Sequence, residues 1–178
     1  MGTEMAEAIA RIASACWELG HYPQQFKEAR TITLRKPEKP KYSDPGAWRP
    51  IALLSTIGKV IETLIAKRIG KVAEENHLLL DTQMGARAGR STEIALELLT
   101  RQIYTIWSSK RHVATLLSVD ILGVFDIVNP IRMLDILRKK GLPHWIVQWV
   151  QAFITWRSTT LVIQGHETPS FPIEAGVL

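Results

Sequence analysis

Residues 113–130 constrain the chain most, because they place two carboxylates directly after an apolar run. The run from Val113 to Val119 is rich in β-branched side chains and has the length of a buried strand. It ends at Asp120, and a turn through Gly123 leads to a second carboxylate, Asp126. A strand that ends in an acidic residue can hold a hard divalent cation such as Mg²⁺, because oxygen ligands suit that ion. A surface aspartate before a helix start is the second interpretation of the same residues.

A phenylalanine before the second carboxylate completes the pattern D-x-x-G-x-F-D at 120–126. After an apolar strand, this pattern resembles the first catalytic motif of reverse transcriptases. The flanking sequence is similar, more narrowly, to the enzymes of non-LTR (LINE-type) retrotransposons, in particular those of fungi. The resemblance implies that Asp120 binds the catalytic metal, that Phe125 is the steric gate against the ribose 2′-hydroxyl, and that Asp126 is a structural acid. Leu122 and Val124 are bulkier than the residues usual in the family, which argues against full activity because such sites tolerate little displacement.

Two cations flank an apolar run in the stretch PGAWRPIALLSTIGKVIE at 45–62. Arg49 and Lys59 are positively charged at pH 7 and suit phosphate oxygens, arginine through its fork and lysine as a point charge. A surface arginine and a lysine beside a helix are the alternative. The stretch resembles the fingers block of the same family, which implies that Arg49 and Lys59 face the triphosphate of the incoming nucleotide or the template.

A loop rich in glycine and arginine, DTQMGARAGRST, covers residues 81–92. Its glycines allow a close backbone approach, and Arg87 and Arg90 add positive charge ahead of a helix N-terminus. The G-K-[S/T] of a Walker loop is absent. The loop resembles the family's Q-F-G-F-R-x-G-R-S-T, which implies phosphate contacts for both arginines. Met84 and Ala86 replace the two aromatic residues of that motif, and a lost aromatic costs about 1–3 kcal/mol per stacked base.

The last stretch, residues 156–177, resembles the family's segment that leads into its second palm motif. Leu178 stands where the family has the proline of P-Q-G-S-x-L-S-P, and the paired aspartates of the next motif are absent from this sequence. Two-metal nucleotidyl transfer needs carboxylates from separate strands that hold two ions about 3.5–4 Å apart. We therefore expect a reverse transcriptase truncated after its first catalytic motif, which does not polymerise DNA by itself.

Hydrophobic periodicity predicts an α/β (α+β) chain that is rich in helices. We expect helices over 4–19, 55–72, 92–107, 130–140 and 143–155, and strands over 29–35, 113–119, 159–163 and 171–173. Ser55 or Thr56, Ser91 and Pro130 suit helix starts, and Gly141 suits a helix end. The resemblance implies a single partial domain over 1–178, with fingers at about 1–112 and part of the palm of a right-hand polymerase at 113–178.

A formal net charge of +5 suits an anionic partner such as nucleic acid, although a solvated basic face would give the same total. A single cysteine excludes an internal disulfide, and five scattered histidines argue against a histidine metal site. No apolar run approaches the length of a membrane span, and no signal peptide is visible, so we expect an intracellular chain without membrane contact.

These features predict a fragment of an RNA-directed DNA polymerase (a nucleotidyltransferase) from a non-LTR retrotransposon. The resemblance implies Mg²⁺, an RNA template, a DNA primer and deoxynucleoside triphosphates (dNTP) as its cofactor and ligands. Two alternatives stay open. One is a non-catalytic nucleic-acid binder, and the other is a retroelement-derived effector of a fungal pathogen that acts on a host protein in the host cell.

Overall fold

The computed structural model describes residues 2–109, 112–121, 123, 127–173 and 176. The chain divides into two compact units, one formed by Met1–Lys67 with Gly123–Leu178 and the other by Arg68–Leu122. The predicted site residues Phe125 and Asp126 lie outside the described residues, as do their bulky neighbours at 122 and 124.

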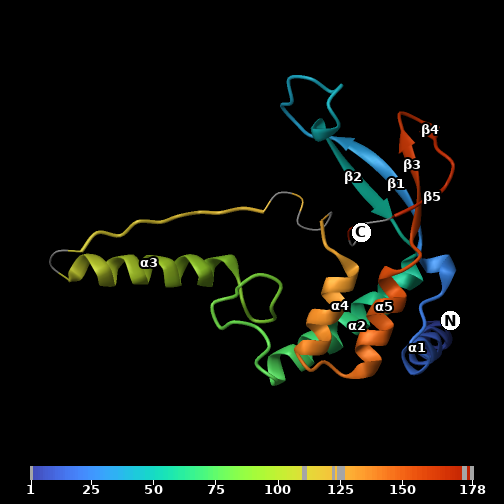
Figure 1. Cartoon of the computed structure of the whole chain (residues 1–178), viewed down its shortest axis with the longest axis horizontal. Helices are drawn as coiled ribbons and strands as arrows, with labels where there is room; N and C mark the ends of the chain where they lie inside the picture. Colours follow the sequence, from blue (N-terminus) through green and yellow to red (C-terminus); the bar gives the residue numbers. More distant parts are fainter. Residues whose placement is uncertain (1, 110–111, 122, 124–126, 174–175, 177–178) are drawn as a thin grey trace. The chain divides into compact units, whose positions relative to one another are not determined.

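A mixed sheet belongs to the first unit (Figure 1). Strand β1 (Glu28–Arg35) lies between β2 (Trp48–Leu53), to which it is antiparallel, and β3 (Ser158–Ile163), to which it is parallel. β3 pairs in turn with the short strands β4 (His166–Glu167) and β5 (Phe171–Pro172). The expected strands over 29–35 and 159–163 are thereby confirmed, and the expected return strand is present as β5.

The sequence pattern does not predict β2, because its residues read as an apolar run that leads into a helix. β2 pairs only with β1 among the described strands, with Leu34 opposite Arg49 and Thr33 opposite Pro50. Proline has no N–H for a second ladder, so Pro50 suits the edge of a sheet and not its middle. The connection between the two strands, residues 36–47, is named the hairpin tip here and ends in the short 3₁₀ helix η2 (Pro45–Ala47).

Four helices gather at one end of this sheet in Figure 1: α1 (Gly2–Glu18), α2 (Thr56–Glu75), α4 (Pro130–Lys139) and α5 (His144–Ile154). α1 and α4 both contact α5. α5 contributes much of the apolar core, with Ile146, Val147, Trp149, Val150 and Ile154 buried. Pro130 occupies the first turn of α4, and Gly141 follows its end at φ +74°, as expected. Of the described helices, none is both long enough and apolar enough to cross a bilayer.

Tyr22, which is 1% exposed, lies at the centre of the core between α2 and α5. Its ring contacts Trp149 and Phe153 edge-on, at centroid distances of 5.4 and 5.3 Å. Its hydroxyl donates a hydrogen bond of 2.6 Å to Glu62 Oε1. α2 approaches this closely because residue 58 is glycine, since a Cβ there would lie 2.7 Å from the Tyr22 hydroxyl. The glycine is therefore required by packing.

Two buried cations, Lys27 and Arg157, are neighbours where β1 and β3 begin. The register pairs Glu28 with Ser158, so the residues before them lie side by side on the parallel strands. Burial lowers the pKa of Lys27, and the charge of Arg157 lowers it further. The Arg157 guanidinium lies 4.7 Å from the centroid of the Phe153 ring, and its Nε and Nη1 have no hydrogen-bond partner in the described part of the chain. Arg157 is therefore a buried cation whose donors are only partly satisfied within the described residues, which is costly for the folded state.

The second unit contains the last residues of α2, a loop and α3 (Thr92–Ser108). Ser91 caps α3 as expected, because its side chain accepts a hydrogen bond of 3.3 Å from Ile94 N. Residues 112–121 form neither a helix nor a β-strand, so the prediction of a buried strand at 113–119 is wrong. The apolar side chains of this run are 62% to 90% exposed, for Val113, Leu116, Leu117, Val119 and Ile121.

The reason for this error is that a strand is stabilised by its partners. Ladder hydrogen bonds and cross-strand side-chain pairs supply most of the stability, whereas local β propensity is weak and depends on context. Each described strand pair contains β1 or β3, and none of them contains residues 112–121. An apolar, β-branched run therefore remains without a ladder here.

We predict opposite effects for alanine at two glycines of α2. Alanine normally stabilises a helix over glycine by about 1 kcal/mol. At Gly58 the new methyl group would collide with the Tyr22 hydroxyl, so Gly58→Ala should lower the free energy of unfolding by about 1–3 kcal/mol, as overpacked cores do. At Gly70 it would meet no atom within 4 Å, so Gly70→Ala should raise that free energy. Urea unfolding followed by circular dichroism measures both, and stabilisation by both changes would contradict the packing role of Gly58.

Candidate nucleic-acid interface

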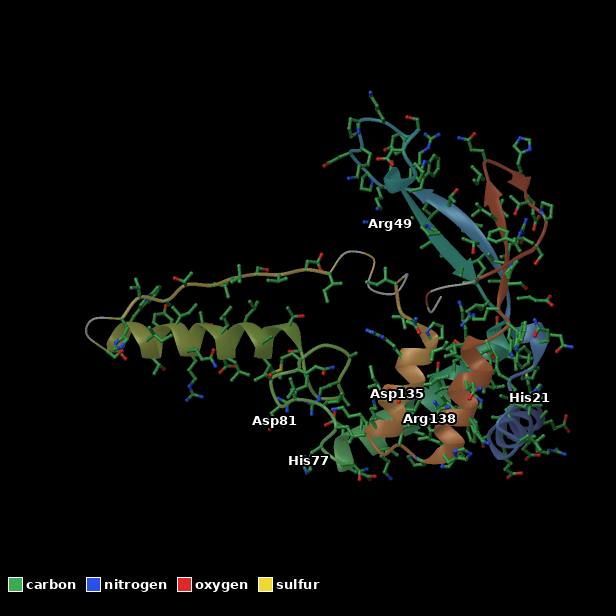
Figure 2. The ribbon with its side chains drawn as sticks, viewed as in Figure 1. His21, Arg49, His77, Asp81, Asp135 and Arg138 are labelled. Atoms are coloured by element: carbon green, nitrogen blue, oxygen red, sulfur yellow. The ribbon has the colours of Figure 1, made fainter. Side chains whose placement is uncertain are left out.

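Arg49 is an exposed residue of the edge strand β2 (Figure 2). The residue opposite it on β1 is Leu34, so the neighbouring strand places no carboxylate there. Within the described residues Arg49 forms no ion pair. A guanidinium in this situation offers its fork of N–H donors to a partner outside the chain, and that fork matches a phosphate through two parallel hydrogen bonds.

Lys59 lies near the N-terminal end of α2 and is also exposed. Ser55 precedes the helix, and its Oγ accepts a hydrogen bond of 3.4 Å from Gly58 N, which confirms the cap expected there. The start of a helix carries a partial positive charge, to which a lysine adds a full one. No carboxylate in the described part of the chain pairs with Lys59. Such an end favours anionic ligands.

Arg87 anchors the 81–92 loop to the end of α2. Its side chain is 7% exposed, and it donates two hydrogen bonds to the Glu74 carboxylate, from Nε at 2.8 Å and from Nη2 at 2.5 Å. Its Nη1 donates to the carbonyl oxygens of Leu80 and Gln83 at 2.7 and 3.4 Å. The hydrogen bond from Arg87 lowers the pKa of Glu74, and the same bond raises the pKa of Arg87. A phosphate contact by Arg87 therefore requires this ion pair to open.

Arg90 is less committed than Arg87. It is half-buried, and its Nη1 donates to the sulfur of Met84 at 3.9 Å. A thioether is a weak acceptor, and the described residues place no carboxylate within ion-pair distance of Arg90. Of the two arginines in this loop, Arg90 is thus the one whose N–H donors are more available to a phosphate.

Asp120 is exposed, and its Oδ1 accepts a hydrogen bond of 2.9 Å from the N–H of the next residue, Ile121. Among the described residues, no group of three histidine, cysteine, aspartate or glutamate side chains is placed to hold a metal ion. A two-metal centre needs several oxygen ligands, so one carboxylate does not fit it. The described residues do not build a magnesium site by themselves.

The candidate residues are divided between the two units. Arg49 and Lys59 belong to the first, whereas Arg87, Arg90 and Asp120 belong to the second. The structure brings the two loop arginines together and assigns them different partners. Sequence reasoning missed the partner of Arg87, because nothing in the spacing singles out a glutamate thirteen residues earlier. It also missed Tyr42 and Trp48 among the cations of 35–49, although basic residues interleaved with aromatic ones are typical of nucleic-acid surfaces.

Comparison with known proteins gives the family. Residues 35–177 match the family of the reverse transcriptases (RNA-dependent DNA polymerases), and every candidate residue lies within that range. The chain therefore belongs to the reverse transcriptase family.

Its relatives narrow this class to the polymerases of non-LTR retrotransposons. The chain is 35% identical over 118 residues to the probable RNA-directed DNA polymerase from transposon BS of Drosophila melanogaster, which is 66% of this chain and 13% of that protein. It is 31% identical over 169 residues to the corresponding polymerase from the transposon X-element of the same fly, which is 95% of this chain and 18% of that protein. The chain is also 26% identical over 169 residues to the RNA-directed DNA polymerase from the mobile element jockey of Drosophila melanogaster, again 95% of this chain and 18% of that protein. The chain thus spans less than a fifth of the length of these relatives, and these insect proteins give no support to a fungal affiliation.

The Glu74–Arg87 pair should make the 81–92 loop sensitive to acid. The folded pKa of Glu74 lies below its usual value of 4.5, so its contribution to stability is present above that value and is lost as the pH falls through the folded pKa. Glu74→Gln should remove this contribution at neutral pH and speed hydrogen exchange of the loop amides, for example Gln83 N and Arg90 N. Glu75→Gln is the control, because Glu75 pairs with Lys71 within the helix. Equal loop protection in both variants would contradict the anchoring role.

Proposed function

We propose that this chain is part of the RNA-directed DNA polymerase of a non-LTR retrotransposon and supplies phosphate-binding surfaces of its reverse transcriptase domain. In this proposal, residues of about 1–112 are the fingers and 113–178 are part of the palm of a right-hand polymerase. The ligands are an RNA template, a DNA primer and deoxynucleoside triphosphates. The observation that carries the proposal is the match of residues 35–177 to reverse transcriptases, a range that contains the exposed and unneutralised Arg49 and Lys59.

The cations have different tasks in this proposal. Arg49 binds phosphate oxygens of the triphosphate or the template through its fork, and Lys59 adds a point charge at the start of α2. Arg90 contacts the backbone of the nucleic acid from its loop. Arg87 holds that loop and contacts phosphate only when it leaves Glu74.

The proposed role of Asp120 is that of a ligand for the divalent metal, Mg²⁺. Phe125 is the proposed gate against the ribose 2′-hydroxyl, and Asp126 the structural acid. Among the described residues Asp120 is a single carboxylate without a cluster of further ligands, so a two-metal step would need ligands beyond them. Nucleic-acid binding without chemistry is the second candidate function, and it is favoured by the exposed Arg49 and Lys59, which form no ion pair among the described residues. No observation supports an effector that acts on a host protein.

Binding of single-stranded RNA over a series of salt concentrations tests the cationic sites. Arg49→Ala and Lys59→Ala should each weaken binding and reduce the slope of log K against log salt by about 0.7, because each removes one phosphate contact. Lys67→Ala, an exposed lysine further along α2, should leave the slope unchanged. Fluorescence anisotropy measures the affinities, and equal slopes in all four proteins would contradict the assignment of Arg49 and Lys59.

Primer extension on an RNA template with Mg²⁺ separates binding from chemistry. We expect this chain to bind the template but to give no more DNA product than its Asp120→Ala variant, since the described residues place no further ligands around Asp120 and a single carboxylate cannot hold two metal ions. RNA binding should persist in Asp120→Ala, because the residue is proposed as a metal ligand and not as a phosphate contact. DNA product that disappears in Asp120→Ala would show that the chain is catalytically sufficient.

A further inference from the structure

The hairpin tip is closed by an aromatic and cationic cluster that no motif predicts. Arg35, the last residue of β1, lies opposite Trp48 in the ladder. Its guanidinium carbon is 5.1 Å from the centroid of the Tyr42 ring and 5.3 Å from that of the Trp48 ring. The two rings meet edge-on at 5.9 Å. Arg35, Tyr42 and Trp48 are named the clamp below.

Hydrogen bonds connect the clamp to the backbone of the tip. The Tyr42 hydroxyl donates to the carbonyl of Lys36, and Trp48 Nε1 donates to the carbonyl of Tyr42, both at 2.9 Å. The ammonium group of Lys36 donates a hydrogen bond to the Gly46 carbonyl, also at 2.9 Å. Asp44 Oδ1 accepts from Gly46 N at 2.9 Å. Side-chain hydrogen bonds therefore connect the start of the tip, at Lys36, with its end, at Gly46 and Trp48.

The exposed cations of the tip that form no ion pair among the described residues are two lysines, and the tip also carries the exposed carboxylate of Glu38, which does not line the hollow described next. Lys39 and Lys41 are exposed, and no described carboxylate lies within ion-pair distance of either. Both line a surface hollow of about 370 Å³, together with Pro40, Ser43, Asp44, Gly46 and Ala47. The single acid of this hollow, Asp44, already accepts the Gly46 N–H. The tip lies at the end of β1 and β2 that points away from α4 and α5 (Figure 1).

We propose that Arg35, Tyr42 and Trp48 are positioning residues that hold the hairpin tip in one conformation, so that Lys39 and Lys41 contact the phosphate backbone of a single-stranded nucleic acid. The inference rests on the proposed function, because it assigns a further part of the same phosphate-binding surface. A twelve-residue loop that had to be ordered on binding would lose affinity through the entropy of its backbone and of its lysine side chains. The clamp removes this loss before the ligand arrives.

Preorganisation and direct contact have different signatures in a salt titration. A residue that contacts phosphate releases counterions, so its loss changes the slope of log K against log salt, by about 0.7 for each contact on a single strand. A residue that only preorganises the tip changes the affinity at every salt concentration and leaves the slope as it was. A residue that only stabilises the fold changes the melting temperature and leaves the affinity of the folded protein unchanged.

The experiment measures the affinity of the whole chain for single-stranded RNA at several salt concentrations, beside the melting temperature. Arg35→Lys keeps the charge but loses the planar guanidinium, and Tyr42→Phe keeps the ring but loses the bond to Lys36. Each should raise the Kd about tenfold with an unchanged slope, since ordering of the tip is then part of binding. Each should also speed hydrogen exchange at Lys36 N and Ala47 N, which are bonded within the tip. The double variant Lys39→Gln, Lys41→Gln should instead reduce the slope by about 1.4.

Arg11→Lys is the matched control, because Arg11 is an exposed arginine of α1 whose ion pair is with Glu7 in the same helix. The proposal is overturned if Arg35→Lys and Tyr42→Phe bind RNA as tightly as the wild type does. It is also overturned if Arg35→Gln, which removes the charge, reduces the slope, since Arg35 would then contact phosphate itself. A wild-type chain that fails to bind RNA at low salt would overturn the proposed function. That result differs from the one that overturns the role of the clamp alone, in which the wild type binds RNA and the clamp variants bind it equally well.

Discussion

The hydroxyl and ring of Tyr22 hold together segments that are far apart in the sequence. The ring joins η1 (Gln24–Phe26), through Phe26, to Trp149 and Phe153 of α5, while the hydroxyl reaches Glu62 of α2. Burial and the bond to Glu62 raise the pKa of Tyr22, so the phenol remains a donor across the physiological range. Because η1 leads directly into β1 and β2 leads into α2, this contact fixes both ends of the hairpin that carries Arg49.

The same core also contains two buried cations, at positions where apolar side chains would have a smaller desolvation penalty. Lys27 and Arg157 lie beside the aromatic cluster, and the Phe153 ring gives the Arg157 guanidinium a cation–π contact in place of some lost hydrogen bonds. Desolvation of two neighbouring cations opposes folding, whereas the Tyr22 cluster favours it. The first unit therefore combines a well-packed aromatic centre with two buried, mutually repelling cations at the start of its parallel strand pair.

Local signals in the sequence are sufficient for the helices, because caps and apolar periodicity act within a few residues. Ser91 and Pro130 show this, since both occupy the positions in α3 and α4 that their chemistry favours. Pairing between distant segments is not visible in the same way, which is why β2 escaped prediction and why residues 113–119 were wrongly expected to form a strand. The candidate site follows the same division: the motifs identify Arg49 and Arg87 as equals, and only their surroundings separate an exposed guanidinium from one held by Glu74.

The proline in β2 determines how this sheet meets other molecules. An unpaired strand edge is a template on which strands of a second molecule can assemble, and this is a common route to aggregation. The ring nitrogen of Pro50 cannot donate to such a strand, and the charge of Arg49 beside it opposes close approach of an identical edge. At β2 the border of the sheet is therefore a poor template for a further strand, while its arginine is exposed to solutes.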